Sequence, residues 1–382
     1  MNRRQFLRVS LYTGAAALGA PMINRGRFQL FADDTTEYST RAMDLVGRSP
    51  AVIDMLSLLT LDWPKLYGWQ KEPSTFGETE LRKLRSSGVS IFHPAVDPQS
   101  SKPREAALLW TRRWNNFLSA HPSWFLRVDT PADLARARAE GKIGILIGFQ
   151  NADHFESVQD VELFHGLGQR VVQLTYNVCN RIGAGCQEAK DTGLTEYGAQ
   201  IVQEMNRVGM AVDVSHCSDR TTLQAMAVSK KPVLVTHSNC RALVPHPRCK
   251  SDKVIKELAA RGGVMGITVI PAFVRQGRPA HVEDVLDHFD HVARLVGVEH
   301  VGLGSDADLD AIDPRTKKVR SRYVVRGMQH ARRTFDLAEG LLRRGYRDQQ
   351  IELILGGNFR RAMTEIWNVK PAAAPASPAA VS

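Results

Sequence analysis

The sequence predicts an α/β protein that folds as one (β/α)8 TIM-type barrel with extra helices at its C-terminal end. Eight short apolar runs, rich in β-branched residues and without polar alternation, are typical of strands buried on both faces. Helical segments separate these runs, and regular alternation of the two favours a closed parallel barrel. An open doubly wound sheet is the alternative, but Gly183-Ala184-Gly185 does not complete the glycine-rich dinucleotide turn that would favour it.

The elements follow one another in regular order. The predicted strands are 51–56, 89–92, 143–149, 170–175, 210–215, 232–236, 263–270 and 300–304. The predicted helices between them are 78–86, 103–118, 131–140, 158–167, 196–207, 219–227, 251–260 and 282–295, and two further helices follow at 328–344 and 349–367. Several helices start after a capping residue, such as Thr130 before Pro131 and Ser251 before Asp252.

Composition excludes several classes of protein. With 43% hydrophobic and 24% charged residues, the 382-residue chain can bury a large core, so it is not disordered or fibrous as a whole. The formal charge is +10, but the basic residues are scattered and no nucleic-acid motif accompanies them, so we predict no nucleic-acid partner. The five cysteines are odd in number and form no CxxC pair, which excludes a disulfide framework and a thiolate zinc site.

Both ends of the chain are predicted to lie outside the barrel. Arg3-Arg4, then Phe6-Leu7 and a short apolar stretch, resemble a twin-arginine export signal. That stretch is too short for a membrane span, so we expect no stable span after export and a location in the periplasm or on the outer face of the membrane. The expected division is a signal and linker at 1–40, the barrel at 41–368 and a disordered Ala/Pro/Ser tail at 369–382.

Polar side chains gather where the predicted strands end. Active sites of this fold form at the carboxyl-terminal rim, so residues far apart in sequence are expected to meet there. The residues at these positions are Asp54, His93, Gln150, Tyr176, Asn177, His216, His237 and Asp306.

Within this set, His216 and His237 form the clearest pair. They end neighbouring strands, which lie about 4.8 Å apart, so two imidazoles at matching heights can share one metal ion. The alternative is a pair of histidines satisfied by hydrogen bonds. Asp306 can ligate a metal or accept a proton from water, or it can cap a turn. Arg248, on the loop after the sixth strand, can bind a substrate carboxylate bidentately or lie on the surface.

The chain resembles the membrane (renal) dipeptidase family, metallopeptidases with an amidohydrolase-type barrel, over roughly residues 45–367. The stretches that carry the resemblance include 173–177 (QLTYN), 213–216 (DVSH), 235–239 (VTHSN), 246–248 (HPR) and 300–306 (HVGLGSD). The resemblance implies hydrolysis of small dipeptides at a zinc centre, where in the family two metal ions share a bridging glutamate. It also implies a possible homodimer.

The resemblance also implies roles for particular residues. By position, His216 and His237 match the two histidines of one metal. Arg248 matches the arginine that receives the substrate's carboxylate, and Asp306 matches the aspartate beside the catalytic water.

Four other positions depart from the family pattern. The first-strand His and Asp ligands of the other metal fall on Leu56 and Leu58, and the bridging glutamate falls on Gln150. Leucine cannot ligate zinc, and glutamine brings no negative charge between two cations. The family's substrate-binding histidine falls on Tyr176, whose phenol can donate a hydrogen bond to a developing oxyanion.

We therefore expect a dipeptidase with a reduced site. One zinc ion is expected on His216 and His237, with Gln150 or Asp306 completing its ligands, and Arg248, Tyr176 and Asn177 are expected to bind substrate. Two alternatives stay open. One is a catalytically degenerate barrel that binds a small peptide-like ligand, and the other is a different amidohydrolase-type activity on lactones or amides.

Overall fold

The computed structural model describes residues 38–97, 100–309, 316 and 323–368. The predicted export signal and the predicted Ala/Pro/Ser tail lie outside these residues. Within the described ranges, every helix is too short or too polar to span a bilayer. Tyr38 already packs against the body, since its hydroxyl donates to Asp336 at 3.0 Å.

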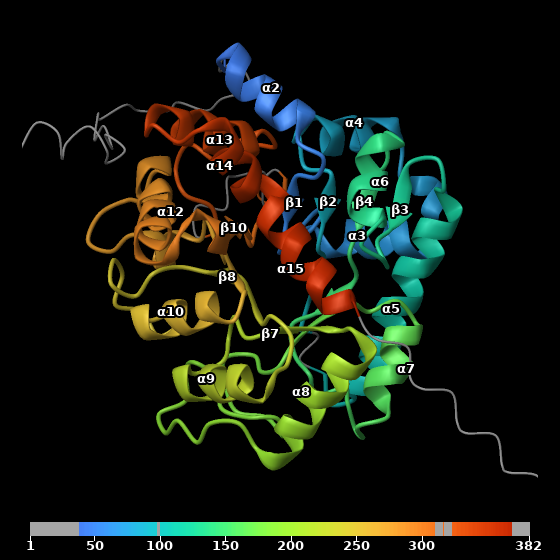
Figure 1. Ribbon diagram of the computed structural model, residues 1–382. Helices are drawn as coiled ribbons and strands as arrows, with labels where there is room; N and C mark the ends of the chain where they lie inside the picture. Colours follow the sequence, from blue (N-terminus) through green and yellow to red (C-terminus); the bar gives the residue numbers. More distant parts are fainter. Residues whose placement is uncertain (1–37, 98–99, 310–315, 317–322, 369–382) are drawn as a thin grey trace, which may run out of the picture.

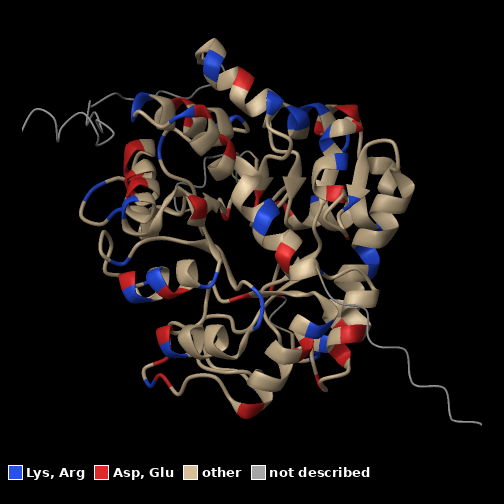
Figure 2. Ribbon diagram, in the orientation of Figure 1, with Lys and Arg blue, Asp and Glu red and all other residues tan. Residues whose placement is uncertain are grey.

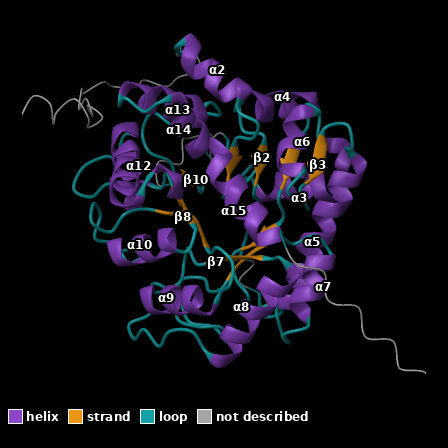
Figure 3. Ribbon diagram, viewed as in Figure 1, coloured by secondary structure: helices purple, strands orange, loops and turns teal. Residues whose placement is uncertain are grey.

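Ten short parallel strands form one sheet in the order β3-β4-β2-β1-β10-β9-β8-β7-β6-β5 (Figures 1 and 3). All eight predicted strands are present; seven are shorter than predicted, and the strand predicted at 232–236 has the same length but lies two residues later, at Leu234–Ser238. The strands are β1 (Ile53–Asp54), β2 (Ile91–Phe92), β3 (Phe125–Arg127), β4 (Ile143–Ile145), β5 (Gly148–Phe149), β6 (Val171–Gln173), β7 (Ala211–Asp213), β8 (Leu234–Ser238), β9 (Val264–Ile267) and β10 (Val301–Leu303).

The sheet closes because β4 and β5 are two halves of one extended segment. On one side this segment follows β2, with Gly144 N donating to Ser90 O at 2.7 Å and Leu146 N to Phe92 O at 2.9 Å. On the other side β4 pairs with β3 and β5 pairs with β6. Counting β4 and β5 as one strand and leaving β3 outside gives a ring of eight, which confirms the predicted TIM-type barrel.

Strand β3 is missing from the sequence prediction. Only its first residue is buried, and it pairs with β4 alone. It therefore lacks the run of apolar residues by which strands covered on both faces are identified.

Helices cover the outside of the barrel (Figures 1 and 3). Charges of both signs are interspersed along these helices (Figure 2). The α-helices are α2 (Thr40–Arg48), α3 (Trp63–Lys71), α4 (Glu78–Ser86), α5 (Pro103–Ala120), α6 (Asp133–Ala139), α7 (Asp160–Gly166), α8 (Glu196–Val208), α9 (Asp219–Val228), α10 (Asp252–Ala260), α11 (Pro271–Val274), α12 (Val282–Val296), α13 (Arg333–Arg343), α14 (Asp348–Glu352) and α15 (Asn358–Trp367).

The predicted helix boundaries hold in part. Ser251 caps α10 as expected, accepting from Val254 N at 3.4 Å. The cap predicted at Thr130 is wrong, because α6 starts at Asp133 and the Thr130 hydroxyl instead donates to the Asp133 carboxylate at 2.9 Å. The single helix predicted over 349–367 is interrupted by a π-helical turn at Leu353–Gly357.

The C-terminal helix α15 closes the bottom of the barrel. Its apolar face belongs to a buried cluster with the first residues of the strands, and Phe359 is fully buried there. Gly302 in β10 lets the Phe359 ring approach, since a Cβ at this glycine would lie 2.6 Å from the ring. Side chains thus fill the amino-terminal end of the barrel, and the carboxyl-terminal end is the one open to form a site.

We predict that Phe359→Ala costs about 3–5 kcal/mol of the free energy of unfolding, because it opens a cavity under the strands. Chemical unfolding of the purified protein measures this loss. Val178→Ala, a matched truncation of a side chain that is 58% exposed, should change stability by less than about 0.5 kcal/mol. Equal losses in the two variants would contradict a sealing role for α15.

Candidate active site at the mouth of the barrel

Two histidines meet at the carboxyl ends of β7 and β8. His216 follows β7 by three residues and His237 lies within β8. Their Nε2 atoms are 3.0 Å apart, and their ring centroids are 5.1 Å apart. Two nitrogens at about 2.1 Å from a tetrahedral zinc ion stand about 3.4 Å apart, so this separation is close to that of two ligands of one ion.

Both rings are held neutral by their surroundings. Burial lowers the pKa of His216 and of His237 well below the usual value, and the positive charges of Arg248 and Lys250 lower both further. A histidine must be neutral to ligate a metal, so the site disfavours protons on these rings and keeps their nitrogens available.

Two buried cations, Arg248 and Lys250, hold the loops that carry the histidines. Arg248 Nη1 donates to Ser215 O at 2.7 Å and its Nη2 donates to His237 O at 2.8 Å. Lys250 Nζ donates to Val214 O at 2.7 Å and also to Cys217 O. These bonds go to the backbone on both sides of His216, so the two cations tie the segment after β8 to the segment after β7.

Arg248 is placed beneath the histidines and not at the surface. Its side chain is 1% exposed, and within the described part of the chain its Nε has no hydrogen-bond partner. The surface alternative for this residue is therefore wrong. Its charge also acts on Asp306, whose pKa it lowers.

Asp306 follows β10 in an unusual backbone conformation. Its φ is 58°, in the left-handed region, and its amide donates to Leu56 O at 2.8 Å. Burial raises the pKa of its carboxyl to about 7, with Arg248 opposing the rise and Asp54 adding to it. A carboxyl that titrates near neutrality can both accept and return a proton at pH 7.

Tyr176 and Asn177 lie against the His216 ring. Tyr176 stacks on it with 4.4 Å between ring centroids and 19° between planes, and burial raises the pKa of the phenol. Asn177 has φ 60°, and its Oδ1 lies 2.7 Å from His216 Nδ1. The structure thus brings Tyr176, Asn177 and His216 together, and it leaves the phenol protonated at neutral pH.

The Gln150 side chain is hydrogen-bonded to a backbone carbonyl of the segment that follows β2. It follows β5, and its Nε2 donates to Ala95 O at 3.0 Å. Below it, His93 is buried in the barrel, with its Nδ1 donating to Leu146 O at 2.8 Å. Gly148 makes room for that ring, since a Cβ there would lie 1.8 Å from it.

The described residues contain no group of three or more His, Cys, Asp or Glu side chains that could hold a metal. Leu56 and Leu58 are buried and apolar. The side chains therefore do not fit a two-metal centre, while the histidine pair fits one ion.

Sequence reasoning missed three residues that act on this pair: Asp213, Thr236 and Lys250. Thr236 Oγ1 lies 2.8 Å from His237 Nδ1 and donates to Asp213 Oδ2 at 2.7 Å. Each lies within three residues of a predicted site residue, and that proximity was the available signal. A buried lysine could not be recognised, because lysine is almost always exposed.

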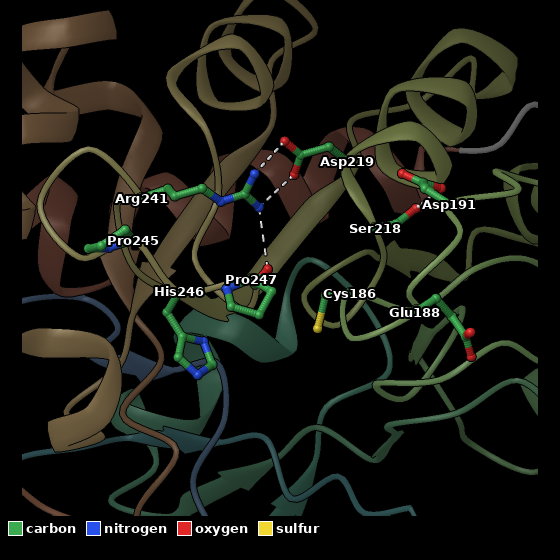
Figure 4. A pocket seen from close by; sticks show the side chains of 10 residues that line it. Cys186, Glu188, Asp191, Ser218, Asp219, Arg241, Pro245, His246 and Pro247 are labelled. Carbon is green, nitrogen blue, oxygen red and sulfur yellow. Dashed lines mark hydrogen bonds and ion pairs between the residues drawn. The ribbon is translucent and has the colours of Figure 1, made fainter.

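A cavity of about 330 Å³ opens on the loops after β6, β7 and β8, and neither His216 nor His237 lines it (Figure 4). Arg241 and Asp219 form a bidentate ion pair across one wall, at 2.8 and 2.9 Å. The opposite wall is tied to the site, because Cys186 N donates to His216 O at 2.7 Å. The lining residues are Gly185, Cys186, Glu188, Asp191, Ser218, Asp219, Arg241, Pro245, His246 and Pro247.

Comparison with known protein families and curated proteins gives a consistent result. The family model described as membrane dipeptidase (Peptidase family M19) matches residues 41–377. Dipeptidase 3 of Rattus norvegicus is 29% identical over 318 residues, which are 80% of this chain and 62% of that protein. Dipeptidase tcpJ of Claviceps purpurea is 34% identical over 241 residues, 62% of this chain and 54% of that protein. The chain thus spans less than two thirds of these relatives.

Solved structures share the fold. An amidohydrolase from Pseudomonas aeruginosa superposes with a TM-score of 0.73 and 28% identity, covering 85% of this chain and 99% of that one. The probable dipeptidase PvdM from the same organism has a TM-score of 0.71 and 21% identity, covering 85% and 97%.

The raised pKa of Asp306 predicts a pH-dependent stability. Its folded pKa of about 7 lies above the ordinary 3.8, so the folded protein binds more protons than the unfolded chain between these values. Stability is therefore lost as pH rises from about 4 to 7. The free energy of unfolding of Asp306→Asn should exceed that of the parent by about 4 kcal/mol at pH 8, and the two should be nearly equal at pH 4.

Urea unfolding at the two pH values, in metal-free protein, measures this difference. Asp44→Asn removes a carboxylate that is 59% exposed and serves as the control, with no comparable gain expected at pH 8. A difference in the free energy of unfolding between Asp306→Asn and the parent that is the same at pH 4 and pH 8 would contradict the raised pKa.

Proposed function

We propose, on the premise that this chain belongs to the membrane dipeptidase family (Peptidase family M19), that it is a zinc-dependent dipeptidase with a reduced, one-metal site. The observation that carries the proposal is the pairing of His216 and His237, whose Nε2 atoms lie 3.0 Å apart in a setting that disfavours protons. The curated dipeptidase relatives support the same class of reaction.

His216 and His237 would hold the zinc, and Gln150 or Asp306 would have to move toward them to act as further ligands, because the described residues bring no third His, Cys, Asp or Glu to the pair. Bound there, zinc supplies Lewis-acid polarisation of the scissile carbonyl. Leu56 and Leu58 leave a second ion without its protein ligands, so the proposal is confined to one ion.

Asp306 is the proposed proton carrier of the reaction. Because burial places its pKa at about 7, the carboxylate takes a proton from the attacking water and returns it to the leaving amine. Its position after β10 faces the same mouth as the histidines, and the charge of Arg248 acts on all three groups.

Tyr176 is the proposed donor to the developing oxyanion, since its phenol stays protonated and stacks on His216. Arg248 attracts the carboxylate of the dipeptide through its charge, and Nε is its one guanidinium nitrogen without a partner among the described residues. Asn177 completes this proposed substrate-binding group.

The missing metal ligands favour a second candidate, a barrel that binds a small peptide-like ligand without hydrolysing it. The described residues offer no third His, Cys, Asp or Glu beside the histidine pair. No feature of the geometry favours lactone or amide hydrolysis in particular. Export by the twin-arginine route and pairing into homodimers remain proposals from the sequence and the resemblance.

Zinc analysis separates the two candidates. We expect about one zinc per chain in the purified protein, release of amino acids from a dipeptide panel, and loss of both in His237→Ala, because a ligand is removed. His300→Ala is the matched control, since His300 bonds Gly263 O at the opposite end of the barrel. Zinc absent from the parent, with no cleavage by either protein, would support the binding candidate.

Tyr176→Phe tests the oxyanion role separately. Loss of one preorganised donor should lower kcat about 10²-fold and leave KM nearly unchanged, because the bond forms mainly in the transition state. Steady-state kinetics on the best dipeptide measure both constants. Tyr67→Phe, on the exposed side of α3, should behave as the parent, and an unchanged kcat in Tyr176→Phe would exclude the role.

A further inference from the structure

Each histidine of the pair has a partner on the ring nitrogen that faces away from the other. His216 Nδ1 lies 2.7 Å from Asn177 Oδ1, and His237 Nδ1 lies 2.8 Å from Thr236 Oγ1. The two Nε2 atoms point at each other across 3.0 Å. The proton on each ring can therefore be located from its Nδ1 partner.

The Thr236 hydroxyl can only accept a hydrogen bond from His237, not donate one to it. A carboxylate has no proton to donate, so the 2.7 Å bond between Thr236 Oγ1 and Asp213 Oδ2 uses the hydroxyl proton of the threonine. The Thr236 oxygen then accepts from His237 Nδ1–H. This leaves the Nε2 of the neutral ring with a lone pair and no proton.

Asp213 is itself held rigidly. Its Oδ1 accepts from Ser215 N at 3.0 Å, Ser215 Oγ at 2.6 Å and Thr236 N at 3.0 Å, and the residue is 2% exposed. Two of the four bonds around this carboxylate, those from the Thr236 amide and hydroxyl, link β7 to β8. The direction of the Thr236 hydroxyl is thus set by the backbone of two strands and does not depend on the His237 ring.

Asn177 fixes the tautomer of the His216 ring in a similar way. An amide oxygen only accepts, so His216 Nδ1 carries the proton and its Nε2 also presents a lone pair. Asn177 adopts the left-handed backbone conformation, at φ 60°, which asparagine tolerates better than most residues.

Two lone pairs facing each other at 3.0 Å repel unless a cation lies between them. A proton bonds covalently to only one of the two nitrogens. A soft divalent ion gains two nitrogen ligands at once.

We infer that Asn177 and the Thr236–Asp213 pair are positioning residues that hold His216 and His237 as Nδ1–H tautomers, so that the paired Nε2 atoms form one nitrogen-lined cation site. The inference rests on the proposed one-zinc site and deepens it. Under this inference Asn177 orients the His216 ring, and Thr236 together with Asp213 orients the His237 ring.

Zinc titration of the full-length metal-free protein tests this. Thr236→Val removes the acceptor at almost unchanged shape and should weaken zinc binding about 10–100-fold, whereas Thr236→Ser keeps the hydroxyl and should restore most of the affinity. Thr111→Val is the matched control, because it removes a buried threonine hydroxyl on α5. Affinity in Thr236→Val equal to that of the parent would overturn the inference.

Histidine-selective ¹⁵N NMR of the metal-free protein gives a second readout that needs no zinc and no activity. We expect protonated Nδ1 on both His216 and His237 in the parent, assigned with single histidine variants, and a proton shifted to Nε2 of His237 in Thr236→Val. Protonated Nε2 on both parent rings would overturn the inference. A parent that binds no zinc yet shows both Nδ1–H tautomers would contradict the proposed function and support the positioning roles.

Discussion

The parallel pairing of β7 with β8 is the constraint on which the rest of the site depends. It brings His216 and His237, 21 residues apart in sequence, to 3.0 Å. The register pairs Asp213 with Leu234, and the Asp213 carboxylate then accepts bonds from Ser215, just after β7, and from Thr236 in β8. A shift of one residue would turn Asp213 and His237 to other faces and separate the imidazoles.

Buried positive charge is the second structural feature of the mouth. Arg248 and Lys250 are each 1% exposed, and no carboxylate within ion-pair distance accompanies either one in the described residues. Burying a cation without an anion is costly, and here backbone carbonyls after β7 and within β8 compensate in part. The arrangement favours an anionic ligand and disfavours protonated histidines, as the proposed one-metal site for a dipeptide carboxylate requires.

The hydrogen bonds behind the proposed metal ligands are present, whereas the ligands that the family resemblance implies on the first strand are not. Apolar Leu56 and Leu58 occupy the rim after β1, yet the hydrogen bonds that orient His216 and His237 are complete. This contrast explains why the fold alone does not decide between a dipeptidase and a binding protein. The chemistry of the remaining pair, and not the barrel, separates the two.

The sequence by itself determined the eight strands of the ring and the residues at their carboxyl ends, because both follow from local apolar runs and their order along the chain. Only the tertiary structure decided how the ring closes through 143–149, how α15 seals its base, and that Arg248 lies buried beneath the histidines. It alone revealed the bonds of Thr236 and Asp213 to His237. These depend on contacts between segments distant in sequence, and no local pattern of residues encodes them.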